Sequence, residues 1–157
     1  MTRVLAILVL VFGPTYARAA DLAAPPVFFA ISVPNLETSL KWYTENLDLT
    51  PVRLPASPKV KVALLKGQGL LVELVEHAEA FDLEARLPGV GEHHLVHGLF
   101  KVGFFVEDLN ATVGRLKKRG VRFKGSVFTD DVANARSILL LDNNGNMIQL
   151  FERLGRH

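Results

Sequence analysis

Residues 27–43 read VFFAISVPNLETSLKWY, and the pattern within them changes from that of a strand to that of a helix. Residues 27–33 form a compact run of Phe, Ile and Val, which is typical of a buried strand. Asn35 suits the position before a helix because its side-chain oxygen can accept from the free amides of the first turn. Apolar residues then recur at helical spacing and form one stripe: Leu36, Leu40, Tyr43 and Leu47. This pattern predicts a strand that leads directly into a helix.

Three further strands are predicted after this helix, and they complete a βαβββ unit. They cover residues 50–54, 59–65 and 70–75. Gly67-Gln68-Gly69 is a turn sequence that joins the last two strands as a hairpin. The first unit therefore spans residues 27–76.

The second half of the chain repeats this order over residues 99–152. It predicts a strand at 100–106, a helix between Asp108 and Gly120, and strands at 121–123, 135–141 and 146–151. Residues 33–36 (VPNL) also align with residues 106–109 (VEDL). One such unit cannot bury its sheet alone. We therefore predict an α+β fold in which two tandem βαβββ modules, joined by a loop, form a single domain over residues 27–152.

The N-terminal segment, residues 1–19, has the pattern of a secretory signal peptide. Arg3 supplies a positive charge, residues 4–12 are continuously apolar, and residues 17–19 (ARA) offer the small side chains that a signal peptidase reads. The apolar run is short for a bilayer span. We therefore expect a periplasmic or secreted protein with no stable membrane anchor after the signal is cleaved.

The charge balance argues against a nucleic-acid-binding protein, and the lack of cysteine excludes disulfides and thiolate metal sites. The whole chain has a formal net charge of +2, but loss of residues 1–19 would remove Arg3 and Arg18 and leave equal numbers of basic and acidic residues. No basic patch with interleaved aromatic residues remains to bind nucleic acid. Without cysteine, the chain can form neither disulfides nor thiolate metal sites.

Two motifs carry a resemblance to a known family. Residues 31–43 resemble the first strand and helix of a vicinal oxygen chelate module, and residues 142–150 (DNNGNMIQL) are similar to its closing hairpin. This superfamily includes glyoxalases, bleomycin-resistance proteins and extradiol dioxygenases. The resemblance covers residues 27–152, and it implies that the paired mixed sheets curl into a cup with the chemistry inside it.

Alternation along the strands predicts which side chains line the cup. The more uniformly aliphatic set should face the helices: Phe29, Ile31, Val33, Leu70, Val72, Leu74, Val102, Phe104, Val106, Ile148 and Leu150. The opposite face is then mostly apolar: Phe28, Ala30, Ser32, Leu71, Val75, Gly103, Phe105, Met147 and Phe151. Three polar residues interrupt this face, namely Glu73, Lys101 and Gln149. A ligand pocket typically has this composition.

The resemblance also implies where a divalent metal would bind. The family takes one ligand from the first and one from the last strand of each module, and these positions hold Phe28, Glu73, Lys101 and Gln149. Only Glu73 is an ordinary metal ligand, since Phe28 has no lone pair to give and Lys101 carries a proton. We therefore expect the usual metal to be absent, and we expect no other cofactor.

Glu73 and Lys101 allow two interpretations. They could form a structural ion pair at the former metal position, with little net effect on stability. Alternatively, Lys101 could bind a carboxylate, phosphate or enolate oxygen of a ligand while Glu73 performs acid–base catalysis.

A histidine cluster precedes the second module and contains Glu92, His93, His94 and His97. Proline and glycine residues at 88–91 favour a solvated loop over a helix that could bind zinc. Because this loop leads into the strand of Lys101, His97 is a candidate for the mouth of the cup.

Two functions remain open at this point. The first is a metal-free binding protein for a small aromatic or amphipathic ligand, with contacts from Phe28, Glu73, His97, Lys101, Phe105, Met147, Gln149 and Phe151. The second is an enzyme related to the glyoxalases and dioxygenases (a lyase, isomerase or dioxygenase). It would use Glu73 and Lys101 without metal, or metal ligands among His93, His94 and His97. We expect a small-molecule partner and no nucleic acid, and a homodimer is left open.

Overall fold

The computed structural model of the chain describes residues 27–54, 57–89 and 95–155. The predicted signal peptide at residues 1–19 lies outside the described residues, as do Glu92, His93 and His94. No helix in the described part of the chain is long and apolar enough to cross a membrane.

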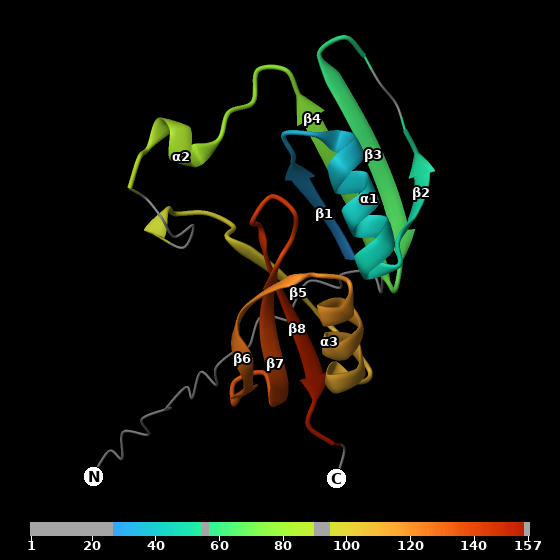
Figure 1. Cartoon of the computed structure of the whole chain (residues 1–157), viewed down its shortest axis with the longest axis vertical. Helices are drawn as coiled ribbons and strands as arrows, with labels where there is room; N and C mark the ends of the chain where they lie inside the picture. The colour runs from blue at the N-terminus through green and yellow to red at the C-terminus, as the bar shows by residue number, and fades with distance from the viewer. Residues whose placement is uncertain (1–26, 55–56, 90–94, 156–157) are drawn as a thin grey trace, which may run out of the picture.

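Two four-stranded mixed sheets form the fold, and one helix packs on each (Figure 1). The first module contains β1 (Val27–Ser32), α1 (Leu36–Leu47), β2 (Thr50–Arg53), β3 (Val60–Gly67) and β4 (Leu70–His77). The second contains β5 (Lys101–Phe105), α3 (Leu109–Lys118), β6 (Arg122–Asp130), β7 (Ala135–Leu141) and β8 (Met147–Arg153). A short helix, α2 (Leu83–Arg86), lies between them in the chain.

The strand orders of the two sheets are the same. They are β1-β4-β3-β2 and β5-β8-β7-β6. In each module the first and last strands pair in parallel, and the other neighbours are antiparallel. The predicted α+β fold of two tandem βαβββ modules is therefore confirmed, with the sheets in a cup-like arrangement.

The ends of the long helices follow the local signals in the sequence. The side chain of Asn35 accepts from the backbone N–H of Thr38 at 2.8 Å, and that of Asp108 accepts from Ala111 at 2.8 Å. After α3, Gly120 has a φ of +77°, a left-handed conformation that glycine adopts without strain. Both predicted N-caps and the predicted C-terminal glycine are confirmed.

Strand β6 is longer than predicted. The sequence indicated a short strand at 121–123, whereas β6 extends over 9 residues. Gly125, with a φ of +86°, and a shift of register after Lys124 interrupt the alternation by which a strand is recognised. Pairing with β7 sustains the strand beyond this irregularity.

The core lies between each sheet and its helix. On β4 the alternate residues Leu70, Val72 and Leu74 are buried, while their neighbours are less so. On β8, Ile148 and Leu150 are buried too, and Gln149 between them is also buried. Alternation had assigned these apolar side chains to the helix-facing side, and this assignment is confirmed.

The two modules meet along α1. Arg115 on α3 forms an ion pair with Asp48 at 3.1 Å and donates to the carbonyl of Asn46 at 3.2 Å. The hydroxyl of Tyr43 donates to Asp142, in the turn between β7 and β8, at 2.9 Å. In Figure 1, α1 accordingly lies directly above α3.

Candidate ligand-binding site

The register of β5 against β8 brings the predicted site residues of the second sheet together. The pairs are Lys101 with Met147, Gly103 with Gln149, and Phe105 with Phe151. Paired residues share one face of a sheet. All six therefore lie on the face turned away from α3, which is called the open face below.

A chain of hydrogen bonds holds the Lys101 ammonium on the open face. Lys101 Nζ donates to Gln149 Oε1 at 2.6 Å, and Gln149 Nε2 donates to Ser137 Oγ at 2.8 Å. The Ser137 hydroxyl in turn donates to the carbonyl of Leu150 at 2.9 Å. Gln149 and Ser137 are both buried. Because both ends of the amide have a matching partner, its oxygen is fixed toward Lys101.

Within the described ranges, no carboxylate pairs with the Lys101 ammonium. Among the residues that the structure describes, no Asp or Glu forms an ion pair with Lys101, and Glu73 has no hydrogen-bond or ion-pair partner. The Glu73–Lys101 pair that the sequence suggested is therefore not formed. Glu73 lies on β4, beside Ala30 and Leu64 of the first sheet, whereas Gln149 stands on the strand adjacent to Lys101.

Gly103 makes room for an aromatic ring on the open face. A Cβ atom at this position would lie 2.8 Å from Cε2 of Phe151. The Phe151 ring can therefore lie over β5 only because residue 103 has no side chain. The Phe151 and Phe105 ring centroids are 5.3 Å apart. The Arg153 guanidinium carbon lies 4.5 Å from the Phe105 centroid. The open face thus carries two neighbouring rings with a cation at either end.

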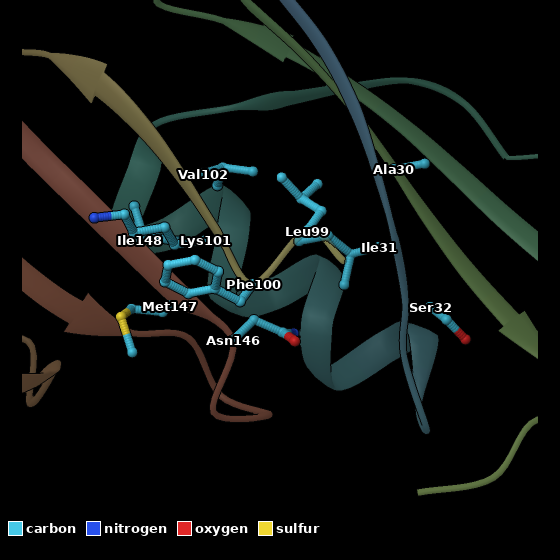
Figure 2. A pocket seen from close by; sticks show the side chains of 10 residues that line it. All are labelled: Ala30, Ile31, Ser32, Leu99, Phe100, Lys101, Val102, Asn146, Met147 and Ile148. Carbon is cyan, nitrogen blue, oxygen red and sulfur yellow. The ribbon is translucent and has the colours of Figure 1, made fainter. Parts of the chain in front are cut away.

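A cavity of about 290 Å³ adjoins the open face, between β1 and the start of β5 (Figure 2). Its lining comes from residues 30–32, 99–102 and 146–148. Figure 2 shows Leu99 and Phe100 between the two sheets, with β1 on one side and β5 and β8 on the other. Of the predicted site residues, Lys101 and Met147 line this cavity.

Three predicted site residues lie neither on the open face nor in the lining of the cavity. Phe28 is 55% exposed at the start of β1, and His97 is exposed in the segment before β5. Glu73 stands on β4 of the first sheet. None of the three lines the cavity. The second sheet therefore provides most of the candidate site.

Two residues that contact predicted site residues on the open face, Ser137 and Arg153, were not identified from the sequence. Ser137 lies opposite Phe151 on β7, and Arg153 continues the alternation of β8 by one more step. Each had a weak signal. Ser137 is the one hydroxyl residue in the largely aliphatic strand 135–141, and Arg153 follows Phe151 at the spacing of two that places residues on one face.

The sequence matches the family model described as the Glyoxalase/Bleomycin resistance protein/Dioxygenase superfamily over residues 26–150. The chain belongs to this superfamily. The match includes both modules, so the resemblance drawn from residues 31–43 and 142–150 is confirmed. Comparison with curated proteins gives no match.

Solved structures from several organisms share the superfamily fold with this chain. A glyoxalase/bleomycin resistance protein/dioxygenase domain from Frankia sp. EAN1pec aligns with a TM-score of 0.66 and 21% identity, over 87% of this chain and 96% of that chain. The trypanothione-dependent glyoxalase I of Leishmania major aligns with a TM-score of 0.57 and 22% identity, over 80% of this chain and 84% of that chain. A genomically encoded fosfomycin resistance protein from Listeria monocytogenes aligns with a TM-score of 0.59 and 13% identity, over 82% of this chain and 92% of that chain. At these identities the likeness shows the fold alone.

The residues at the superfamily's metal positions do not fit a divalent metal. Phe28 offers no donor atom, and Lys101 brings a positive charge whose ammonium already occupies the oxygen of Gln149 at 2.6 Å. In the described ranges, no group of three or more His, Asp or Glu side chains could hold a metal ion. Glu73 alone is too little for such a site.

Proposed function

We propose that this superfamily member binds a small aromatic or amphipathic molecule on the open face of the second sheet, without a divalent metal. The observation that carries the proposal is the Lys101 ammonium, held 2.6 Å from Gln149 where the resemblance implies a metal ligand. A fixed polar group beside an aromatic surface is the usual composition of a small-molecule site.

Exposed apolar side chains favour binding at this face. Phe105 is 49% exposed, and Phe128, which lies opposite Ser137, is 41% exposed. Large apolar groups gathered on one exposed face are typical of a contact surface. The cavity beside Lys101 gives a ligand room to extend toward β1. The homodimer that the sequence left open could cover the same face, so the oligomeric state should be measured with binding.

Export is part of the proposal and rests on the signal pattern of residues 1–19. Mass spectrometry of the protein from a periplasmic or culture fraction should find a mature N-terminus shortly after Ala19. Protein that keeps Met1 and stays in the cytoplasmic fraction would contradict export.

Elemental analysis and a neutral fluorescent dye test the binding function. Protein purified without added metal should hold far less than one equivalent of zinc, nickel, iron or manganese. Phenylnaphthylamine, a neutral aromatic dye, should bind saturably, and Phe151→Ala should weaken binding by about tenfold because it removes apolar contact area. Phe81→Ala is the matched control, since Phe81 is 64% exposed near α2 and lies off the open face.

Two results would overturn the binding function. One is a stoichiometric metal that resists chelation, which would favour the enzymatic alternative. The other is dye binding that Phe151→Ala and Phe81→Ala change equally, which would place the dye elsewhere on the protein.

A further inference from the structure

The open face of the second sheet carries more cations than anions. Cross-strand pairing places four basic residues and one acidic residue on it: Lys101, Arg122, Lys124, Arg153 and Asp130. The Asp130 carboxylate already accepts from the backbone N–H of Ala133 at 2.9 Å. This excess of positive charge favours an anionic ligand over a cationic one.

Lys101 is the cation best placed to contact a ligand in the cavity. It lines that cavity, and its ammonium has three N–H donors, of which one is directed at the neutral amide of Gln149. By contrast, Arg122 donates to the carbonyl of Asp142 at 3.2 Å, and Arg153 lies over the Phe105 ring. Lys101 is exposed, so an anionic group of a ligand can reach its ammonium and form a charge-assisted hydrogen bond with it.

An aromatic surface begins beside this ammonium. Gly103 stands between Lys101 and Phe105 on the same face, and the Phe151 ring lies over Gly103. The Phe100 ring centroid is 5.7 Å from Lys101 Nζ. A ligand ring that packs against these side chains would place an attached anionic group within reach of the ammonium.

We infer that the ligand is a small aromatic anion of the carboxylate or sulfonate class. Its charged group accepts from Lys101 Nζ while its ring packs against Phe151. The inference rests on the proposed binding function and adds the charge and orientation of the ligand. Because charge-assisted hydrogen bonds are stronger than neutral ones, Lys101 should distinguish an anion from a neutral molecule of the same shape.

Two dyes with the same ring system test this inference. Anilinonaphthalene sulfonate carries a sulfonate that phenylnaphthylamine lacks. Lys101→Met, which keeps most of the side-chain length, should weaken binding of the sulfonate dye by about tenfold and change the neutral dye by less than about twofold. Lys101→Arg should retain sulfonate binding. Lys117→Met is the matched control because Lys117 lies on α3, and it should change neither affinity.

The outcomes separate the inference from the function on which it rests. If neither dye binds the unmodified protein, the proposed function fails. If both dyes bind but Lys101→Met weakens neither, or weakens both equally, the inference is overturned and the binding function stands. A sulfonate-specific loss that Lys101→Arg restores supports the inference.

A salt titration of the unmodified protein gives the same test without a variant, in case Lys101→Met does not fold. Raising sodium chloride from about 50 mM to about 500 mM shortens the screening length. It should weaken binding of the sulfonate dye by several-fold relative to the neutral dye. Equal responses of the two dyes would overturn the inference.

Discussion

The hydroxyl of Tyr43 donates a 2.9 Å hydrogen bond to Oδ2 of Asp142, and the two residues are 99 positions apart in the sequence. Both are almost fully buried. The same carboxylate accepts from the backbone N–H groups of Asn144 and Asn146 and from Asn146 Nδ2. Burial first, and then the Asp142 charge and hydrogen bond, raise the pKa of Tyr43 far above its usual value, so the hydroxyl keeps its proton. This bond ties α1 of the first module to the β7–β8 turn of the second.

Tyr43→Phe should lower the free energy of unfolding by about 1–3 kcal/mol, because it leaves the buried Asp142 carboxylate one donor short. Thr44→Val is a matched control on the same helix. Thr44 Oγ1 is buried and has no hydrogen-bond partner among the described residues, so its loss should cost little. Urea denaturation followed by circular dichroism measures both variants. Equal losses would show that the Tyr43–Asp142 bond does not stabilise the module junction.

Gly103→Ala should destabilise the second sheet by about 1–3 kcal/mol, as overpacking of a tight site commonly does. The new Cβ would lie 2.8 Å from Phe151 Cε2 and 3.2 Å from the carbonyl oxygen of Gln149. Dye binding should weaken too, since the Phe151 ring must move. Gly114→Ala is the control, because a Cβ there meets no atom within 4 Å on α3 and should stabilise the helix by about 0.5–1 kcal/mol. A Gly103→Ala variant as stable as wild type would contradict the close packing.

Glu76 makes stability depend on pH. Its Oε1 accepts from Lys61 Nζ at 2.6 Å, and its Oε2 accepts from the backbone N–H of Leu36 at 2.8 Å. These bonds, that from Lys61 first, lower the pKa of Glu76. For a lowered carboxyl pKa, the contribution to stability is complete above the unfolded-state pKa and is lost as pH falls through the folded-state pKa.

Glu76→Gln should therefore be less stable than wild type at about pH 7, and the difference should shrink at about pH 3. Glu79→Gln is the control, since Glu79 faces Lys59 at 3.4 Å with both side chains largely exposed. Such a surface pair contributes little at either pH. Urea midpoints at the two pH values check the prediction. A Glu76→Gln difference that stays constant with pH would show that the carboxylate is not responsible.

Glu73→Gln should leave binding of both dyes unchanged within about twofold. The structure places Glu73 on β4, beside Ala30 and Leu64, and the ammonium of Lys101 is bound by Gln149 instead. Substituting an exposed or half-buried residue that does not contact the ligand usually has little effect on stability or binding. Fluorescence titration of the two dyes measures this. A loss of dye affinity as large as that caused by Lys101→Met would show that Glu73 takes part in binding.

Helix ends and strand faces were predictable because neighbouring residues decide them. Asn35 and Asp108 cap their helices with their own side chains, and alternation reports which side chains turn away from the helix. The length of β6 was not predictable in this way. Gly125 breaks the alternation, and pairing with β7 keeps the strand extended.

By itself the sequence determined that the chain forms two βαβββ modules and that Lys101, Gln149 and Phe151 share one face of a sheet, because periodicity within a few residues carries that information. Only the tertiary structure decided that Lys101 bonds Gln149 and not Glu73, and that Tyr43 meets Asp142. Those partners depend on which strands become neighbours and how the two modules pack. Contacts between residues so far apart in the chain leave no periodic signal in it.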